Sequence, residues 1–265
     1  MEYLLYLGVG AVAGLLGGLL GIGGGLVIVP FLVFSFQAQK FAPEVATHMA
    51  IATSLATIIF TSISSVKAHH ERGAVRWDLA RLLVPGIVLG TLLGAQIAHL
   101  LPGRTLQLII GVFALVMSLQ MFLDWKPGGT RTATLPGSRG LLAAGGVIGL
   151  ASALFGIGGG SLTVPWLSYH AVRMQEAVAT SSACGLAIAL AGTLGFIIVG
   201  WNTENLPSGA LGYVYLPAFV GISVTSIIFA RLGVRLAHHL PAATLKKVFA
   251  GLLVIVGAQF ILGVY

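Results

Sequence analysis

The sequence Gly21-Ile-Gly-Gly-Gly25 occurs a second time as Gly156-Ile-Gly-Gly-Gly160, 135 residues further along a chain of 265. Each copy is followed by a Val-Pro pair, Val29-Pro30 in the first case and Val164-Pro165 in the second. Each copy also interrupts an apolar segment with residues that weaken helices. The chain therefore consists of two versions of one half. Each half contains a break at which backbone groups lose their helical partners, and such a break inside a bilayer is the first place to look for function.

The composition places the chain in a lipid bilayer. Hydrophobic residues make up 57% of it and charged residues 8%, whereas a soluble domain carries about 25% charged residues. Six apolar runs approach or exceed the roughly 20 residues that span a hydrocarbon core: Val45–Val66, Leu79–Leu100, Leu106–Leu123, Ala177–Gly200, Ala210–Ala230 and Val248–Tyr265. The net charge of +7 comes from basic residues in short loops, where they orient a membrane protein. No nucleic-acid partner is therefore expected.

The similarity between the halves extends beyond the glycines and divides the chain into three parts. Ala46-Thr47 matches Ala179-Thr180, and Val84-Pro85 resembles Leu216-Pro217. Residues 94–102 align with residues 233–241, and both stretches end in Leu-Pro. The expected domains are a first membrane repeat over 1–123, a cytoplasmic linker over 124–139 that is rich in Pro, Gly and Thr, and a second membrane repeat over 140–265.

Each half is predicted to contain a broken element followed by three transmembrane helices. The broken element comprises Tyr3–Leu20 and Leu26–Phe36 in the first half, and Leu141–Phe155 and Ser161–His170 in the second. The pieces after the glycines, about ten residues long, are too short to cross alone. An interrupted helix that crosses the bilayer would produce four spans per half and parallel repeats. A re-entrant hairpin would produce three spans per half and inverted repeats.

The 14 Lys and Arg residues favour the hairpins. If the loop that contains Arg72 is cytoplasmic, crossing elements would place seven basic residues on each side. With hairpins, Lys40 and Arg104 lie outside and the other twelve lie inside, as the positive-inside rule requires. The predicted fold is therefore an all-α integral membrane protein with two inverted-topology repeats. We place it in a bacterial inner (plasma) membrane with both termini outside.

The two breaks form the expected binding site. The short helix after each break begins near the bilayer midplane, where its positive end and free backbone N–H groups can bind an anion without a buried Lys or Arg. Inverted-repeat transporters bind substrate between such half-helices. The candidate binding residues here are Gly23, Gly24, Gly25, Gly158, Gly159, Gly160 and Ser161. The alternative role of these glycines is tight helix packing.

Hydroxyl groups and one histidine follow the breaks. Hydroxyls can donate hydrogen bonds to an anion without the penalty of burying a charge, so we add Thr47, Ser54, Thr180 and Ser181 to the site. Their alternative role is to bond carbonyls of their own helix or a neighbouring helix. His48 lies inside a predicted span, where it would donate to the anion, relay protons, or form an ordinary interfacial hydrogen bond.

The acidic residues argue against a cation as substrate. All seven lie near predicted helix ends, whereas cation pumps and many proton-coupled carriers place a carboxylate at mid-membrane. Glu44 and Glu176 are expected in the first turns of their helices, where they favour the helix dipole. No metal-ligand spacing is present, so no metal or cofactor is expected.

These features resemble the TauE/SafE family of sulfite and organosulfonate exporter-like permeases. The resemblance rests on both glycine motifs with their Val-Pro pairs, on Ala46-Thr47-His48-Met49-Ala50 through Ser54-Leu55, and on His70–Trp77 with Pro85, Gly86, Gly90 and Gly94 after it. It covers nearly the whole chain. The loop Trp201–Ala210 departs from the basic loop of the first half, as expected if it lies on the opposite side. The resemblance implies transport, usually export, of small sulfur-containing anions.

The preferred hypothesis is a secondary transporter, and an exporter by the resemblance, for sulfite or organosulfonates. The anion would bind at the midplane and be exposed alternately to the two sides. An anion channel would use the same site without alternation. An intramembrane serine hydrolase with Ser161 and His170 is disfavoured, because nine residues of helix separate the two and position 26 of the other half is Leu. No enzyme activity is therefore expected. The expected partners are the small anion and the bilayer, with proton coupling and oligomeric state left open.

Overall fold

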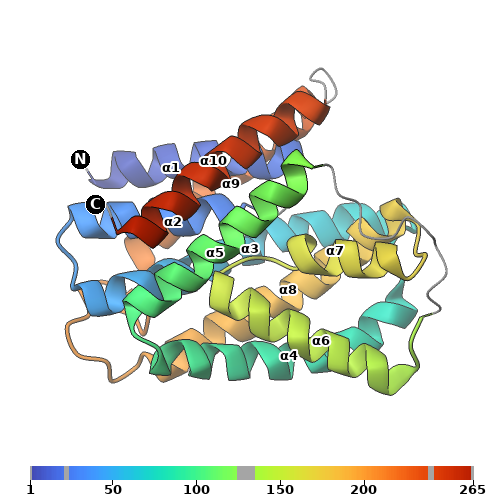
Figure 1. The fold of residues 1–265 in the computed structure, drawn as a ribbon, viewed down its shortest axis with the longest axis horizontal. Coiled ribbons are helices and arrows are strands. Elements are labelled where there is room, and N and C mark those ends of the chain that lie inside the picture. Colours follow the sequence, from blue (N-terminus) through green and yellow to red (C-terminus); the bar gives the residue numbers. More distant parts are fainter. Residues whose placement is uncertain (1, 21–23, 124–134, 238–241, 264–265) are drawn as a thin grey trace.

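The computed structural model describes residues 2–20, 24–123, 135–237 and 242–263, and most of them are helical (Figure 1). The first half contains α1 (Glu2–Leu20), α2 (Gly25–Ala38), α3 (Pro43–Glu71), α4 (Trp77–Leu100) and α5 (Gly103–Phe122). The second contains α6 (Ser138–Phe155), α7 (Gly160–Tyr169), α8 (Met174–Val199), α9 (Leu216–Ala237) and α10 (Ala242–Leu262). Two short strands, β1 (Ala210–Leu211) and β2 (Val214–Tyr215), form an antiparallel hairpin before α9.

Both predicted breaks are present. Helix α1 ends at Leu20 and α2 begins at Gly25, while α6 ends at Phe155 and α7 begins at Gly160. Gly24, which precedes α2, has a φ of 61°, and Gly156, which follows α6, has a φ of 65°. Left-handed backbone is unfavourable by about 1–2 kcal/mol for a residue with a Cβ, so both positions favour glycine.

The broken element of the first half is a hairpin. The side-chain amide of Gln39, just after α2, donates a 2.6 Å hydrogen bond to the hydroxyl of Tyr6 in α1. Helix α2 therefore returns to the end of the molecule at which α1 begins. Figure 1 shows that α10 also ends there.

Five helices, α3, α4, α5, α6 and α8, are long and apolar enough to cross a membrane. Helix α6 was expected to be only the first limb of a hairpin, but its 18 residues also satisfy the length of a span. The predicted apolar run Ala210–Ala230 is not helical from its start. Gly209 and Gly212 adopt positive φ values of 89° and 53°, so the chain forms the β1–β2 hairpin and α9 starts only at Leu216.

The corresponding helices α3 and α8 lie side by side and antiparallel. The hydroxyl oxygens of Ser65, late in α3, and Ser182, early in α8, are 2.9 Å apart. Leu55, nearer the start of α3, lies against Gly192 in the later part of α8. The third helices of the two halves, α3 and α8, therefore run in opposite directions.

Helices α5 and α10 show the same relation. Arg104, at the start of α5, donates to the carbonyl oxygens of Phe260 and Ile261 at the end of α10, at 2.9 and 2.8 Å. Ser118, near the end of α5, donates to the carbonyl oxygen of Ala250, nearer the start of α10. This pair of equivalent helices is therefore also antiparallel.

Helices from different halves also pack in parallel, through glycine. A Cβ on Gly86 or Gly90 of α4 would lie 2.0 Å from the carbonyl oxygen of Leu142 or Gly146 of α6. A Cβ on Gly14 of α1 would lie 2.5 Å from a carbonyl oxygen of α9. Small residues allow such close backbone approach in membrane proteins. The glycines at 86 and 90, which carried part of the family resemblance, thus join the two halves.

Candidate functional site

The two glycine breaks touch each other. A Cβ placed on Gly25 would lie 2.7 Å from the carbonyl oxygen of Gly156 and 3.0 Å from the Cα of Ile157. Gly156 in turn packs against Val29 of α2 and Ile51 of α3. Residues more than 130 positions apart in the sequence therefore form one buried site. Gly23, which was also predicted to bind, lies outside the residues that the structure describes.

Ser54 connects α3 to the second break. Its hydroxyl donates a 2.8 Å hydrogen bond to the carbonyl oxygen of Gly156, and its side chain is fully buried. One turn further along α3, the hydroxyl of Thr57 bonds instead to the Ser54 carbonyl of its own helix. Of these two hydroxyls, only that of Ser54 holds the broken element in place.

Replacing Ser54 by alanine should therefore destabilise the protein by about 1–3 kcal/mol, because the buried Gly156 carbonyl loses its donor. Thermal unfolding of the purified protein in detergent measures this effect. The matched control is Thr57→Val, which removes a buried hydroxyl from the same helix without affecting the second half. Equal stability losses for the two variants would show that the Ser54–Gly156 bond contributes nothing special.

The second break presents unpaired donors. Among the described residues, no hydrogen bond is donated by the backbone N–H groups of Gly158, Gly159, Gly160 or Ser161. The hydroxyls of Ser161 and Thr163, in the first turn of α7, are buried and have no partner within the described part of the chain. Free N–H groups at the positive start of a helix form a site for an anion. Thr163 was not predicted from the sequence.

Helix α8 packs closely against the second break at Gly159. A Cβ on Gly159 would lie 3.0 Å from both the carbonyl oxygen of Ser181 and the backbone nitrogen of Gly185. The hydroxyl of Ser181 itself donates to the Val178 carbonyl of its own helix, at 2.8 Å. Ser181 thus contacts the break through its backbone, and close packing holds α7 in position.

Three of the predicted residues, Thr47, Thr180 and His48, have partners elsewhere. Thr47 accepts a 2.9 Å hydrogen bond from the Gln107 side chain, and Thr180 accepts one of 3.0 Å from the Arg76 backbone N–H. Thr47 is also seven residues, or about 10 Å of helix rise, away from Ser54, the residue on α3 that bonds to the second break.

His48 bonds to the last turn of α4. Its Nε2 lies 3.0 and 3.1 Å from the carbonyl oxygens of Ala98 and Leu101. Because carbonyl oxygens only accept, this nitrogen carries a proton and donates.

The residues of the hydrolase hypothesis are not brought together. Ser161 lies in the first turn of α7 and His170 follows its last residue. The Nδ1 of His170 is 2.9 Å from the carbonyl oxygen of Trp166. Within the described ranges, no group of three or more His, Cys, Asp or Glu side chains is placed to hold a metal ion.

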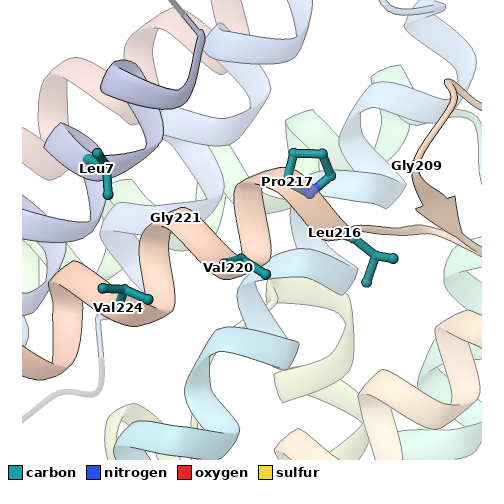
Figure 2. Close-up of a pocket in the computed structure, with 7 residues that line it drawn as sticks. All are labelled: Leu7, Gly209, Leu216, Pro217, Val220, Gly221 and Val224. Atoms are coloured by element: carbon teal, nitrogen blue, oxygen red, sulfur yellow. The ribbon is translucent and has the colours of Figure 1, made fainter.

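Figure 2 shows a groove lined by residues of α1 and α9. It has a volume of about 480 Å³ and runs along α9, where Leu216, Val220 and Val224 line it together with Leu7 of α1. Among the residues that the structure describes, its lining contains no charged side chain and no residue of either glycine motif. An apolar surface of this kind suits a lipid chain better than an anion.

Long apolar helices and two broken elements that meet inside the protein define a helical membrane protein, and its similarity to known proteins places it among membrane transporters. The chain belongs to the family described as Sulfite exporter TauE/SafE, which matches residues 6–260. It is 37% identical over 259 residues to a "Probable membrane transporter protein" of Haemophilus influenzae, with 98% of each chain covered. It is 28% identical to the "Probable membrane transporter protein YunE" of Bacillus subtilis, again with 98% of each chain covered. No solved structure matches the chain significantly.

Proposed function

We propose that this protein is a secondary transporter that exports small sulfur-containing anions such as sulfite or organosulfonates across a bacterial inner membrane. The observation that carries the proposal is the set of unpaired N–H groups and hydroxyls at the second break, Gly158–Ser161 and Thr163, next to the first break. These donors are neutral and fixed, so they suit an anion that sheds its water on entering the membrane. The family description supports a sulfur oxyanion as that anion.

The antiparallel pairing of equivalent helices supports two inverted repeats, over 1–123 and 140–265, joined by the linker 124–139. An axis that exchanges α3 with α8 and α5 with α10 must lie across the helices, in the membrane plane, because each pair is antiparallel. Inverted repeats of this kind alternate access by rocking one part against the other. Both termini would then lie outside. Figure 1 supports this, because the start of α1 and the end of α10 lie at the same end of the molecule.

In this proposal the anion is bound by Gly23, Gly24 and Gly25 on one side and by Gly158, Gly159, Gly160 and Ser161 on the other. Thr163 completes the site with its unpaired hydroxyl, and Ser54 holds the second break in position. Thr47, His48, Thr180 and Ser181 would act further along the pathway. An anion channel would share this site, and saturable counterflow in proteoliposomes would identify a carrier.

Binding can be tested by thermal unfolding of the purified protein with candidate anions. A ligand at 100 times its Kd stabilises the native state by about 2.7 kcal/mol. We expect sulfite, thiosulfate or a small sulfonate to raise the unfolding temperature, and acetate at the same ionic strength to leave it unchanged. Stabilisation by carboxylates or cations alone would overturn the proposed substrate class.

A further inference from the structure

A loop of the second half closes one end of the first half. Tyr213, Val214 and Tyr215, in and next to β2, are buried, although they lie in the connection between α8 and α9. The backbone N–H of Tyr215 donates a 3.0 Å hydrogen bond to the hydroxyl of Thr53 on α3. Thr53 is fully buried and precedes Ser54, which holds the second break. The loop therefore reaches from the end of the molecule to the edge of the proposed binding site.

Aromatic rings of the first half surround Tyr215. Its ring centroid lies 6.1 Å from that of Tyr6, 5.6 Å from that of Phe36 and 5.2 Å from that of Phe41. These rings come from α1, from α2 and from the turn after α2, so they belong to the hairpin that carries the first glycine motif. Through these ring contacts the β1–β2 hairpin of the second half packs directly against the α1–α2 hairpin of the first half.

Tyr213 makes a second contact at the same end. Its ring stacks on that of His48 at 5.1 Å, and its hydroxyl lies 2.9 Å from the Nδ1 of His99. Both histidines belong to the first half, on α3 and α4. The β1–β2 hairpin thus contacts all four of the helices α1, α2, α3 and α4 of the opposite half. No ion pair among the described residues contributes to these contacts.

The opposite end of the molecule has a similar arrangement with the halves exchanged, in which the threonine, Thr180, corresponds in the repeat to Thr47 and not to Thr53. Arg76, in the connection between α3 and α4, donates its backbone N–H to the hydroxyl of Thr180 on α8, at 3.0 Å. The Arg76 guanidinium also lies 3.7 Å from the Glu176 carboxylate. Nearby, Ser65 of α3 contacts Ser182 of α8. In both cases the connection between two helices of one half donates a main-chain N–H to a threonine on the third helix of the other half, α3 or α8.

We propose that these two loops are the gates of the transport pathway. The β1–β2 hairpin closes the outer end, the loop at Arg76 closes the cytoplasmic end, and the present structure is the occluded state with both gates shut. This inference rests on the proposed function. A threonine hydroxyl is a suitable latch because its bond to an N–H is worth about a factor of ten in an equilibrium. Such a gate stays shut on average but opens without exposing a buried charge.

The outer gate can be tested without any substrate. The native cysteine is first removed by Cys184→Ala, and Val214→Cys then places a buried reporter in the hairpin. We expect Thr53→Val to speed labelling of this cysteine by an impermeant maleimide, added to intact cells, by about tenfold, because the latch has lost its acceptor. Thr57→Val is the matched control, since its hydroxyl bonds only within α3. Equal labelling rates in the two variants, or labelling only from the cytoplasmic side, would overturn the outer gate.

The inner gate can be tested by cross-linking. The hydroxyls of Ser65 and Ser182 are close enough for Ser65→Cys and Ser182→Cys to form a disulfide in the Cys184→Ala background. We expect oxidation to stop anion flux in proteoliposomes and reduction to restore it, while Ser65→Cys alone is insensitive to both. Undiminished flux through the cross-linked protein would overturn the inner gate. If the uncross-linked protein neither binds nor transports any sulfur anion, the proposed function fails instead, and the labelling result still stands.

Discussion

Replacing Gly159 by leucine should abolish anion flux while leaving the protein inserted in the membrane. The Cβ of residue 159 would lie 3.0 Å from the backbone of both Ser181 and Gly185, and 3.2 Å from the Thr163 hydroxyl. Backbone atoms of a packed helix cannot give way as a flexible side chain can, so the start of α7 must move. Overpacking of this kind is destabilising by about 1–3 kcal/mol, which is less than the total stability of most proteins. The fold therefore survives, but the N–H groups proposed to bind the anion are displaced.

The measurement is substrate flux in proteoliposomes, together with the unfolding temperature of the same preparation. Gly251→Leu is the matched control, because a Cβ at that position of α10 meets no atom within 4 Å. It should insert and transport like the unaltered protein. Normal flux through Gly159→Leu would remove the second break from the proposed binding site.

The second large effect is expected at the interface between α4 and α6. A Cβ on Gly145 would lie 2.3 Å from the carbonyl oxygen of Leu83, whereas a Cβ on the next residue, Gly146, would lie 3.8 Å from that of Gly86. Gly145→Ala forces the two helices apart, at about 3 kcal/mol, the upper part of the usual range for overpacking. Gly146→Ala makes an ordinary contact and gains helix propensity. Neighbouring substitutions of the same kind should therefore have opposite effects.

Thermal unfolding in detergent compares the two variants directly. Gly145→Ala should unfold at a markedly lower temperature, and Gly146→Ala at or above the temperature of the unaltered protein. Similar unfolding temperatures would mean that the helices adjust to a methyl group more easily than their spacing indicates. The substitutions lie away from the glycine motifs, so this prediction does not depend on the proposed function.

Much of the fold could be predicted because the break in each half is local. Three adjacent glycines interrupt an apolar run wherever that run lies, so the helix ends at Leu20 and Phe155 and the helix starts at Gly25 and Gly160 follow from the pattern. Glu44 and Glu176 were also predicted correctly to lie in the first turns of their helices. This signal is local too, because an acidic side chain there favours the dipole of its own helix. The β1–β2 hairpin was missed because its residues are as apolar as those of a span, and only the backbone conformations at Gly209 and Gly212 separate it from α9.

The binding residues were harder to predict, because a hydroxyl has many equivalent partners in a membrane protein. Ser54 and Thr57 lie three residues apart on α3, and only contact with the second half separates the hydroxyl that holds the break from the one that bonds within its own helix. Thr163 follows the second glycine motif and Thr53 lies in the stretch Ala46 through Leu55, but nothing in either sequence distinguishes these hydroxyls from their neighbours. Their importance arises from what packs against them, which is the second break in one case and Tyr215 in the other.

The sequence by itself determined that this is a membrane protein built from two similar halves, each with a glycine break, because hydropathy and repetition are properties of the chain alone. The tertiary structure decided that the two breaks meet, that equivalent helices are antiparallel, and that a loop of each half contacts a helix of the other half. These facts depend on distances between residues more than 100 positions apart. Glycine permits close approach, but the partner that approaches is chosen by the packing of the whole molecule.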